Sequence, residues 1–234
     1  MREDILSDNP AVFDQLFKMV SRDRVMTNDE LTRFWQALDV SKHGLGIGFS
    51  SLTAIAGKLC ILTLQRAGEV MGMHTDEVDL EAKTWTLPAN RSKNRRSHFI
   101  PLSNLACDLI REARAINANG ATTYSGPLFP SSTKPGQSSE RAVLTRAMKR
   151  CCDGLGIVDA TPHDLRRTGA SMMASELCKV PGEIIARVLN HTPIGSPVTQ
   201  IYNRYDYAAE KRSAMDVWAV ALMKVVASDR CPVS

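Results

Sequence analysis

The sequence predicts a mainly α-helical domain with one small antiparallel β-sheet, an α+β arrangement. Long stretches with apolar side chains at helical spacing occupy most of the chain. Only one region, residues 84–102, shows two short runs of β-branched and aromatic residues joined by a loop. The length of 234 residues, with 44% hydrophobic and 23% charged side chains, fits one large or two small globular domains.

The first half of the chain opens with residues 1–22, which we expect to be the remnant of a linker. Thr27 and Glu30 form a capping box, and this predicts a helix that runs to about residue 39. Residues 50–64 are apolar on nearly every helical face, which is typical of a fully buried central helix.

Two strands are predicted next, over residues 84–88 and 98–102. Residues 90–96 between them form a basic loop. Ser103 is expected to cap the following helix, and residues 117–139, rich in Gly, Ser, Thr and Pro, predict a long loop. Four further helices are predicted, over about residues 139–153, 162–178, 181–190 and 207–227.

Charge and composition limit the class of protein. A net charge of +4 permits a polyanionic partner without demanding one. The chain holds no apolar run long enough to cross a membrane, and its charged start does not resemble a secretory signal. The 6 cysteines form no C-x-x-C pair, and their apolar surroundings predict reduced thiols, which favour a cytosolic location.

Residues 161–167 form the most informative stretch. Thr161 is a good N-cap because its hydroxyl can accept a backbone N–H, and Pro162 suits the first helical position. Asp164 matches the positive end of the helix dipole. His163 and Arg166 then share one helical face. The free N–H groups of the first turn, an imidazole and a guanidinium together form a site suited to a phosphate.

Other polar residues have a structural explanation when each is taken alone. Arg66 follows the buried helix and must be paired or face a polar cavity, and Glu69 one turn later can pair with it. A buried ion pair without function explains both equally well. Lys93 fits a solvated turn, although the arginines beside it also fit a loop that contacts phosphates. His191 fits a helix C-terminal cap, and Tyr202 an ordinary aromatic residue.

Taken together, these residues resemble the catalytic domain of the tyrosine recombinases of the phage-integrase type. The resemblance extends over about residues 25–218. Its elements occur in the family's chain order: Arg66 with Glu69, Lys93 followed by His98-x-x-Pro101-Leu102-Ser103, His163-x-x-Arg166, Leu189-x-His191, and Thr199-Gln200-Ile201-Tyr202.

The resemblance implies the DNA breaking-rejoining fold of that catalytic domain, over residues 23–234. It also implies site-specific DNA recombination or integration. The amino-terminal DNA-clamping (core-binding) domain of such enzymes is expected to be absent from this chain, so we expect weak DNA affinity and little recombination from it alone.

The resemblance also implies the mechanism. Tyr202 would attack the scissile phosphorus and form a 3′-phosphotyrosine link, which a second 5′-hydroxyl then reseals without metal, ATP or any cofactor. A phenol with a pKa of about 10 needs a base, and His163 is the candidate. Arg66 and Arg166 would bind the non-bridging oxygens. Lys93 would protonate the leaving oxygen once a flexible hairpin closes on bound DNA.

The remaining residues would assist. His191 would donate a further hydrogen bond to the phosphate, and Glu69 would support Arg66. Basic residues around the centre would contact the DNA backbone, and these are Arg91, Arg95, Arg96, Arg146, Lys149, Arg150 and Arg167, with Arg141 on the same predicted helix as Arg146. The expected partners are double-stranded DNA at an attachment site and further copies that form a tetramer. The protein, encoded by a bacterium or a phage, is expected in the cytoplasm, associated with the nucleoid.

Several alternatives stay open at this point. A type IB topoisomerase uses the same chemistry, and a non-catalytic helical DNA-binding module would explain the basic loop. A metal-dependent hydrolase would use His163, Asp164 and His191, although no third ligand has a recognisable spacing. The segment before Tyr202 is slightly longer than in many relatives, so Tyr205 and Tyr207 are also candidate nucleophiles. The carboxyl-terminal helix could pack on its own domain or on a neighbour.

Overall fold

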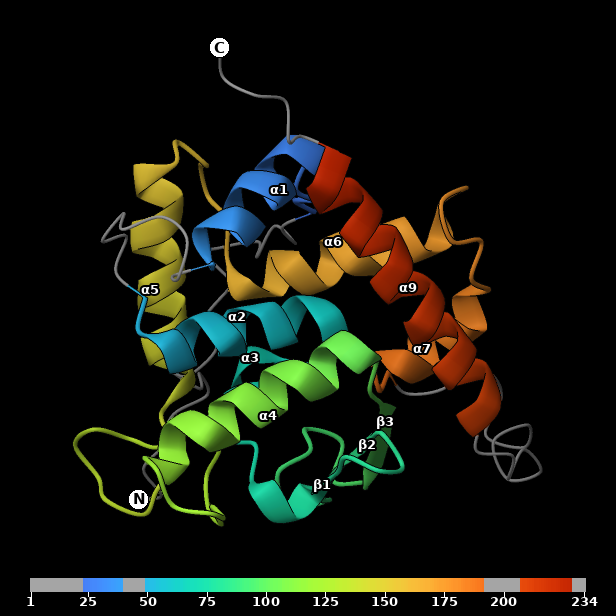
Figure 1. Ribbon diagram of the computed structural model, residues 1–234. Coiled ribbons are helices and arrows are strands. Elements are labelled where there is room, and N and C mark those ends of the chain that lie inside the picture. Colours follow the sequence, from blue (N-terminus) through green and yellow to red (C-terminus); the bar gives the residue numbers. More distant parts are fainter. Residues whose placement is uncertain (1–22, 40–48, 192–206, 229–234) are drawn as a thin grey trace, which may run out of the picture.

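The computed structural model describes residues 23–39, 49–191 and 207–228. Helices surround a small sheet, as predicted (Figure 1). In chain order the elements are α1 (Asn28–Ala37), α2 (Ser51–Thr63), α3 (Ala67–Met71), the 3-10 helix η1 (Thr75–Glu77), β1 (Val78–Asp79), β2 (Thr84–Leu87), β3 (His98–Pro101), α4 (Asn104–Ala118), α5 (Arg141–Gly154), α6 (Pro162–Ala174), α7 (Gly182–Val188) and α9 (Ala208–Ser228).

Helix α2 lies at the centre, between α4 and α6 (Figure 1), and also packs against α3, α5 and α9. The Ser50 hydroxyl accepts the Thr53 N–H at 3.3 Å and caps its start. Side chains on every face from Thr53 to Thr63, except Lys58, are buried. The helix ends at Leu64, which adopts a left-handed conformation with φ 55°. The prediction of a fully buried central helix is confirmed.

The sheet has three antiparallel strands in the order β1-β2-β3. Trp85 pairs with Ile100, and both side chains are buried at the core of the domain. The two predicted strands are confirmed to within one residue. Strand β1, with only two residues, was not predicted because it is too short to show an alternating pattern.

The carboxyl-terminal helix α9 packs on its own domain. The Trp218 indole is fully buried and donates to the carbonyl of Ile61 on α2 at 3.0 Å. The Lys211 ammonium donates to the carbonyl of Phe99 on β3. Among the described residues, α9 therefore joins α2 and the sheet.

One predicted helix end was wrong. Helix α6 ends at Ala174, short of the predicted residue 178, because the Ser175 hydroxyl donates to the Met172 carbonyl and the chain turns there. Cys178 thus lies in a turn.

The other described cysteines are buried and free, as predicted, and burial raises the pKa of the Cys60 thiol to about 12. None of the helices built from the described residues combines the length and apolarity that a membrane crossing requires.

Candidate active site

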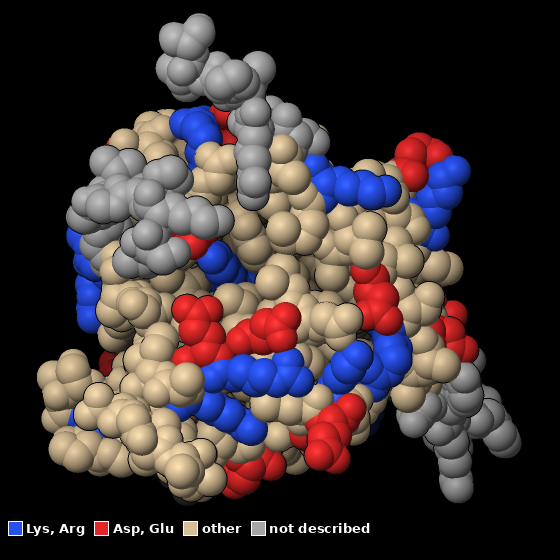
Figure 2. Space-filling model, in the orientation of Figure 1, with Lys and Arg blue, Asp and Glu red and all other residues tan. Residues whose placement is uncertain are grey.

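A cavity of about 530 Å³ brings together side chains from three separate segments. Arg66 comes from the start of α3, Arg141 and Arg146 from α5, and His163 and Arg166 from α6. No Asp or Glu of the described residues lines it. The cavity therefore has the electrostatic character of an anion site. By contrast, the face drawn in Figure 2 mixes cationic and anionic side chains without a patch of one sign.

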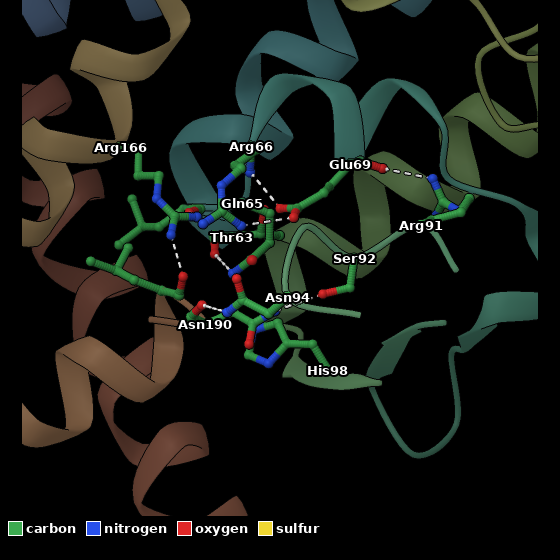
Figure 3. Close-up of polar contacts among 12 residues, drawn as sticks. Thr63, Gln65, Arg66, Glu69, Arg91, Ser92, Asn94, His98, Arg166 and Asn190 are labelled. Carbon is green, nitrogen blue, oxygen red and sulfur yellow. Dashed lines mark hydrogen bonds and ion pairs between the residues drawn. The ribbon is translucent and has the colours of Figure 1, made fainter. Parts of the chain in front are cut away.

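Glu69 fixes Arg66 at two points (Figure 3). Its Oε2 accepts the Arg66 backbone N–H at 3.0 Å, and its Oε1 accepts Nη1 of the Arg66 side chain at 2.9 Å. Glu69 is only 5% exposed. A buried carboxylate that holds both the main chain and the guanidinium of Arg66 fixes the direction in which this arginine enters the cavity.

Arg166 is 3% exposed and is held by the ends of two helices. Its Nη1 donates to the carbonyl of Leu64 at 2.7 Å, and its Nη2 donates to the carbonyl of Leu189. These carbonyls cap α2 and α7, where the helix dipole favours a cation. Burial, and then the nearby Arg66, lower the pKa of Arg166 to about 10, which still leaves it charged at neutral pH. An arginine has further N–H donors that these contacts do not use.

The neighbouring carbonyl of Val188 is bound by two more side chains. Gln65 Nε2 donates to it at 2.9 Å, and the His98 ring nitrogen Nε2 lies 3.1 Å from it. Burial, and then the charge of Lys211, lower the pKa of His98 to about 3, so this ring is neutral at pH 7. The C-terminus of α7 is thus tied to the α2–α3 turn, to β3 and to α6.

The N-terminus of α6 begins as predicted, with Thr161 at the N-cap and Pro162 in the first turn. Oδ2 of Asp164 accepts the Thr161 backbone N–H at 2.9 Å and the Thr161 hydroxyl at 2.6 Å, and Thr161 and Asp164 form a capping box. His163 lines the cavity, one turn before Arg166.

His163 and His191 are both exposed, and both have a lowered pKa. For His163 the causes are partial burial, then Arg167 and Arg166. For His191 they are partial burial, then Arg166, Arg66 and His163. Arg166 and Arg66 act on both rings, so both imidazoles lie near these two guanidinium groups. A neutral imidazole can accept a proton at neutral pH.

The model of the phage integrase family matches residues 24–209 of this chain. The chain belongs to the phage integrase family. It is 32% identical over 159 residues to prophage integrase IntA of Escherichia coli strain K12, which covers 68% of this chain and 36% of that protein. Prophage integrase IntZ of the same strain is 28% identical over 176 residues, covering 75% of this chain and 40% of that protein. The chain thus spans well under half the length of these relatives.

Solved structures confirm the fold. The integrase from mycobacterium phage Brujita superposes with a TM-score of 0.61 at 15% identity, over 89% of this chain and 65% of that one. The catalytic core of lambda integrase gives a TM-score of 0.52 at 16% identity, over 73% of this chain and 96% of that one. The matches therefore confirm the catalytic-domain fold that the resemblance to this family implied.

Not every residue that the sequence predicted for the site lines the cavity. Lys93 is exposed on the β2–β3 loop and is not among the residues that line the cavity. On the same loop, Asn94 donates to the carbonyl of Asn190 at 2.6 Å. Tyr202 and Tyr205 lie outside the described residues.

Tyr207, the third candidate nucleophile, is described. Its ring lies against the Arg187 guanidinium, 3.4 Å from the ring centroid, and its hydroxyl is hydrogen-bonded to Glu183. Both partners are on α7. A hydroxyl held by a carboxylate at this helix is a poor candidate for attack on a phosphate in the cavity, and this favours the upstream tyrosines.

The predicted DNA-contacting residues fall into three groups. Arg146 lines the cavity, together with Arg141 five residues earlier on α5. Arg95, Arg96 and Arg150 are exposed. The remaining three are engaged within the protein: Arg91 donates to Glu77 at 2.9 Å, Lys149 pairs with Asp153 at 2.8 Å, and Arg167 lies 3.7 Å from Asp164.

The structure therefore gives Arg91 an internal partner that its sequence context did not indicate. Residues that sequence reasoning missed are Gln65, His98 as a hydrogen-bonding group, and Asn190. Their only signal was a polar residue inside an apolar segment. Within the described part of the chain, no group of three or more His, Cys, Asp or Glu side chains is placed to hold a metal ion.

Proposed function

We propose that this chain cleaves and rejoins DNA at specific sites through a 3′-phosphotyrosine intermediate, as a site-specific recombinase or integrase. The observation that carries the proposal is the cavity in which Arg66, Arg166 and His163 converge, and which no Asp or Glu of the described residues lines. Membership of the phage integrase family supports the same activity.

In the proposed reaction the Tyr202 oxygen attacks the scissile phosphorus, and the bond from phosphorus to the 5′-oxygen breaks. His163 is neutral at pH 7 and accepts the phenolic proton. Lys93 donates a proton to the departing 5′-oxygen. Rejoining is the reverse with a second 5′-hydroxyl, so the link itself conserves the bond energy and no ATP is needed.

Arg66 and Arg166 bind the non-bridging oxygens, where negative charge grows in the transition state. Each is fixed before DNA arrives, Arg66 by Glu69 and Arg166 by the carbonyls of Leu64 and Leu189. Donors that need no reorganisation are effective, and losing one of this kind costs about 3–4 kcal/mol of transition-state stabilisation. His191 adds a hydrogen bond, and the free N–H groups of α6 favour the anion.

Double-stranded DNA at an attachment site is the proposed substrate. A solved relative is a lambda integrase tetramer bound to a Holliday junction, with a TM-score of 0.55 at 18% identity. We propose the same kind of assembly here, with Arg95, Arg96, Arg146 and Arg150 contacting the DNA backbone. We propose that residues 23–234 form the catalytic domain and that the reaction needs neither metal nor cofactor. It takes place in the cytoplasm, at the nucleoid.

The test uses nicked duplexes that tile the DNA flanking the gene, each releasing a short leaving strand so that the covalent product is trapped. A covalent protein–DNA adduct is expected for the wild-type chain in the presence of EDTA. It should be lost in Tyr202→Phe and kept in Tyr205→Phe. An adduct that persists in Tyr202→Phe would overturn the assignment of the nucleophile, and adducts that require a metal would overturn the mechanism.

A type IB topoisomerase would form the same adduct, so a second assay is needed. A recombinase joins the trapped strand to the 5′-hydroxyl of a different duplex, whereas a topoisomerase relaxes supercoiled plasmid as a monomer. Strand transfer between two labelled duplexes is the expected result. Relaxation without any transfer would favour the topoisomerase.

A further inference from the structure

The loop that joins β2 to β3 is attached to the end of α7 by reciprocal hydrogen bonds (Figure 3). Asn94 Nδ2 donates to the Asn190 carbonyl at 2.6 Å, and Asn190 Nδ2 donates to the Ser92 hydroxyl at 3.1 Å. Ser92 is only 5% exposed and Asn94 is half-buried, but Lys93 between them is exposed. The residues on both sides of Lys93 are thus fixed, while its side chain stays free to reach a ligand.

Asn190 also ends helix α7 and so fixes the position of the backbone at His191. It adopts a left-handed conformation with φ 49°, its N–H bonds the Arg187 carbonyl at 3.2 Å, and the His191 N–H bonds the Ala186 carbonyl at 2.9 Å. This pair of bonds is the Schellman ending of a helix, in which Gly and Asn tolerate the left-handed position best. One residue, Asn190, therefore joins the Lys93 loop to His191.

A second attachment holds the base of the same loop. Arg91 donates to Glu77 at 2.9 Å and to the carbonyl of Glu69 at 3.3 Å, and Glu69 also holds Arg66. A Cβ added at Gly72 would overlap the Arg91 guanidinium, so the glycine makes room for this contact. The loop is therefore positioned relative to Arg66 on one side and His191 on the other.

We propose that Ser92, Asn94 and Asn190 form a positioning latch that holds Lys93 beside His191 for proton donation to the leaving 5′-oxygen. This inference rests on the proposed function. As the Tyr202 oxygen bonds to phosphorus, the electrons of the breaking bond pass to the 5′-oxygen, and the Lys93 ammonium supplies its proton. A latch formed before DNA binds spares the cost of ordering the loop during the reaction.

The test compares the cleavage rates of latch variants on two substrates that differ in the leaving atom. Asn94→Ala removes the donor to Asn190, and Asn190→Gly removes the donor to Ser92 while keeping a residue suited to the left-handed backbone. Each is assayed in single turnover at saturating DNA on the nicked duplex that the wild-type chain cleaves, with either oxygen or sulfur at the scissile 5′ position. A thiol has a pKa of about 8.5, so sulfur departs without a proton donor.

With oxygen, both variants should cleave at least about 10-fold more slowly than wild type, because proton donation is worth about 10²–10⁴-fold and a small misplacement loses part of it. With sulfur, both should cleave close to the wild-type rate. Lys93→Ala should show the same pattern, with a larger loss on oxygen. The sulfur substrate also shows that each variant is folded.

Asn119→Gly is the matched control, because Asn119 also ends a helix in a left-handed conformation, with φ 45°, but is exposed at the far end of α4. It should leave both rates unchanged. Equal losses on oxygen and sulfur, or wild-type rates on oxygen, would overturn the latch. Failure of the proposed function looks different, since wild type would then form no adduct on either duplex.

Discussion

Nη1 of Arg166 on α6 lies 2.7 Å from the carbonyl oxygen of Leu64, the residue that ends α2. Leu64 stands two residues before Arg66, so this hydrogen bond connects the segments that carry the two arginines of the cavity. The left-handed backbone of Leu64, with φ 55°, directs its carbonyl toward α6 instead of continuing the helix. Arg66 and Arg166 are therefore positioned as a unit.

Because Gly169 on α6 has no side chain, α6 can lie close to Leu64. Replacing this glycine gives a first prediction. A Cβ at Gly169 would overlap the Leu64 side chain. Gly169→Ala gains about 1 kcal/mol in helix propensity. Overpacking costs about 1–3 kcal/mol. The overlap should offset or outweigh this gain, so the free energy of unfolding should fall by about 0–2 kcal/mol, with a loss of DNA cleavage.

Chemical denaturation measures this effect, and Gly182→Ala is the control. Gly182 opens α7, and a Cβ there meets nothing within 4 Å. This change should preserve or slightly raise stability. If Gly169→Ala were more stable than wild type by the full gain in helix propensity of about 1 kcal/mol, the close approach of α6 to Leu64 would be refuted.

His98 should make stability depend on pH. Its pKa is lowered to about 3 in the folded chain, mainly by burial, whereas the unfolded chain has the ordinary value of about 6.5. Between these values only the unfolded state binds the proton, so stability falls as the pH falls below about 6.5. The slope is about 1.4 kcal/mol per pH unit at most.

His98→Gln keeps an N–H donor near the Val188 carbonyl but does not titrate. Between pH 7 and pH 5 it should lose about 2 kcal/mol less stability than wild type, as measured by urea unfolding at each pH. The other histidines are common to both proteins and cancel in the comparison. Identical pH dependence in the two proteins would show that His98 is protonated as easily in the folded as in the unfolded state.

Arg167 should tune the pH dependence of cleavage. After burial, Arg167 is the leading cause of the lowered pKa of His163. If His163 is the base, cleavage falls as the pH drops through that pKa, because the protonated ring cannot accept the phenolic proton. Arg167→Gln removes the neighbouring charge, so the pKa rises and the acid limb of the profile should move to higher pH.

The profile is measured in single turnover at subsaturating DNA, which reports the free protein. Arg111→Gln on the exposed surface of α4 is the control and should not move the limb. A limb that stays in place in Arg167→Gln would argue against His163 as the base.

Local patterns predicted much of the fold. The apolar run of residues 50–64 could only be a buried helix, and the β-branched runs around the basic loop could only pair as a hairpin. Helix α3, with 5 residues, is too short for periodicity to reveal. Thr161 was placed correctly at the N-cap, but the hydrogen bond from its hydroxyl to Asp164 was not predicted, because propensity does not say which partner a hydroxyl takes.

Only those site residues were predicted whose side-chain type is unusual for its position in the sequence. Arg66, His163 and Arg166 were identified because a guanidinium or imidazole in an apolar or capping context needs an explanation. The contacts of Gln65 and His98 with Val188 were missed, since they join segments about 90 to 120 residues apart and depend on tertiary packing. The ion pair of Arg91 with Glu77 was also missed, although these residues are only 14 apart, because they lie on different elements and no local pattern pairs them.

The most direct test of the account is whether Arg66 and Arg166 bind the same phosphate. Cleavage by wild type, Arg66→Ala and Arg166→Ala is measured on two nicked duplexes, one with a normal scissile phosphate and one with a neutral methylphosphonate there. The account predicts a loss of about 10²–10³-fold for each variant on the phosphate and a much smaller loss on the methylphosphonate, where the charge they stabilise is gone. Equal losses on both duplexes would contradict it.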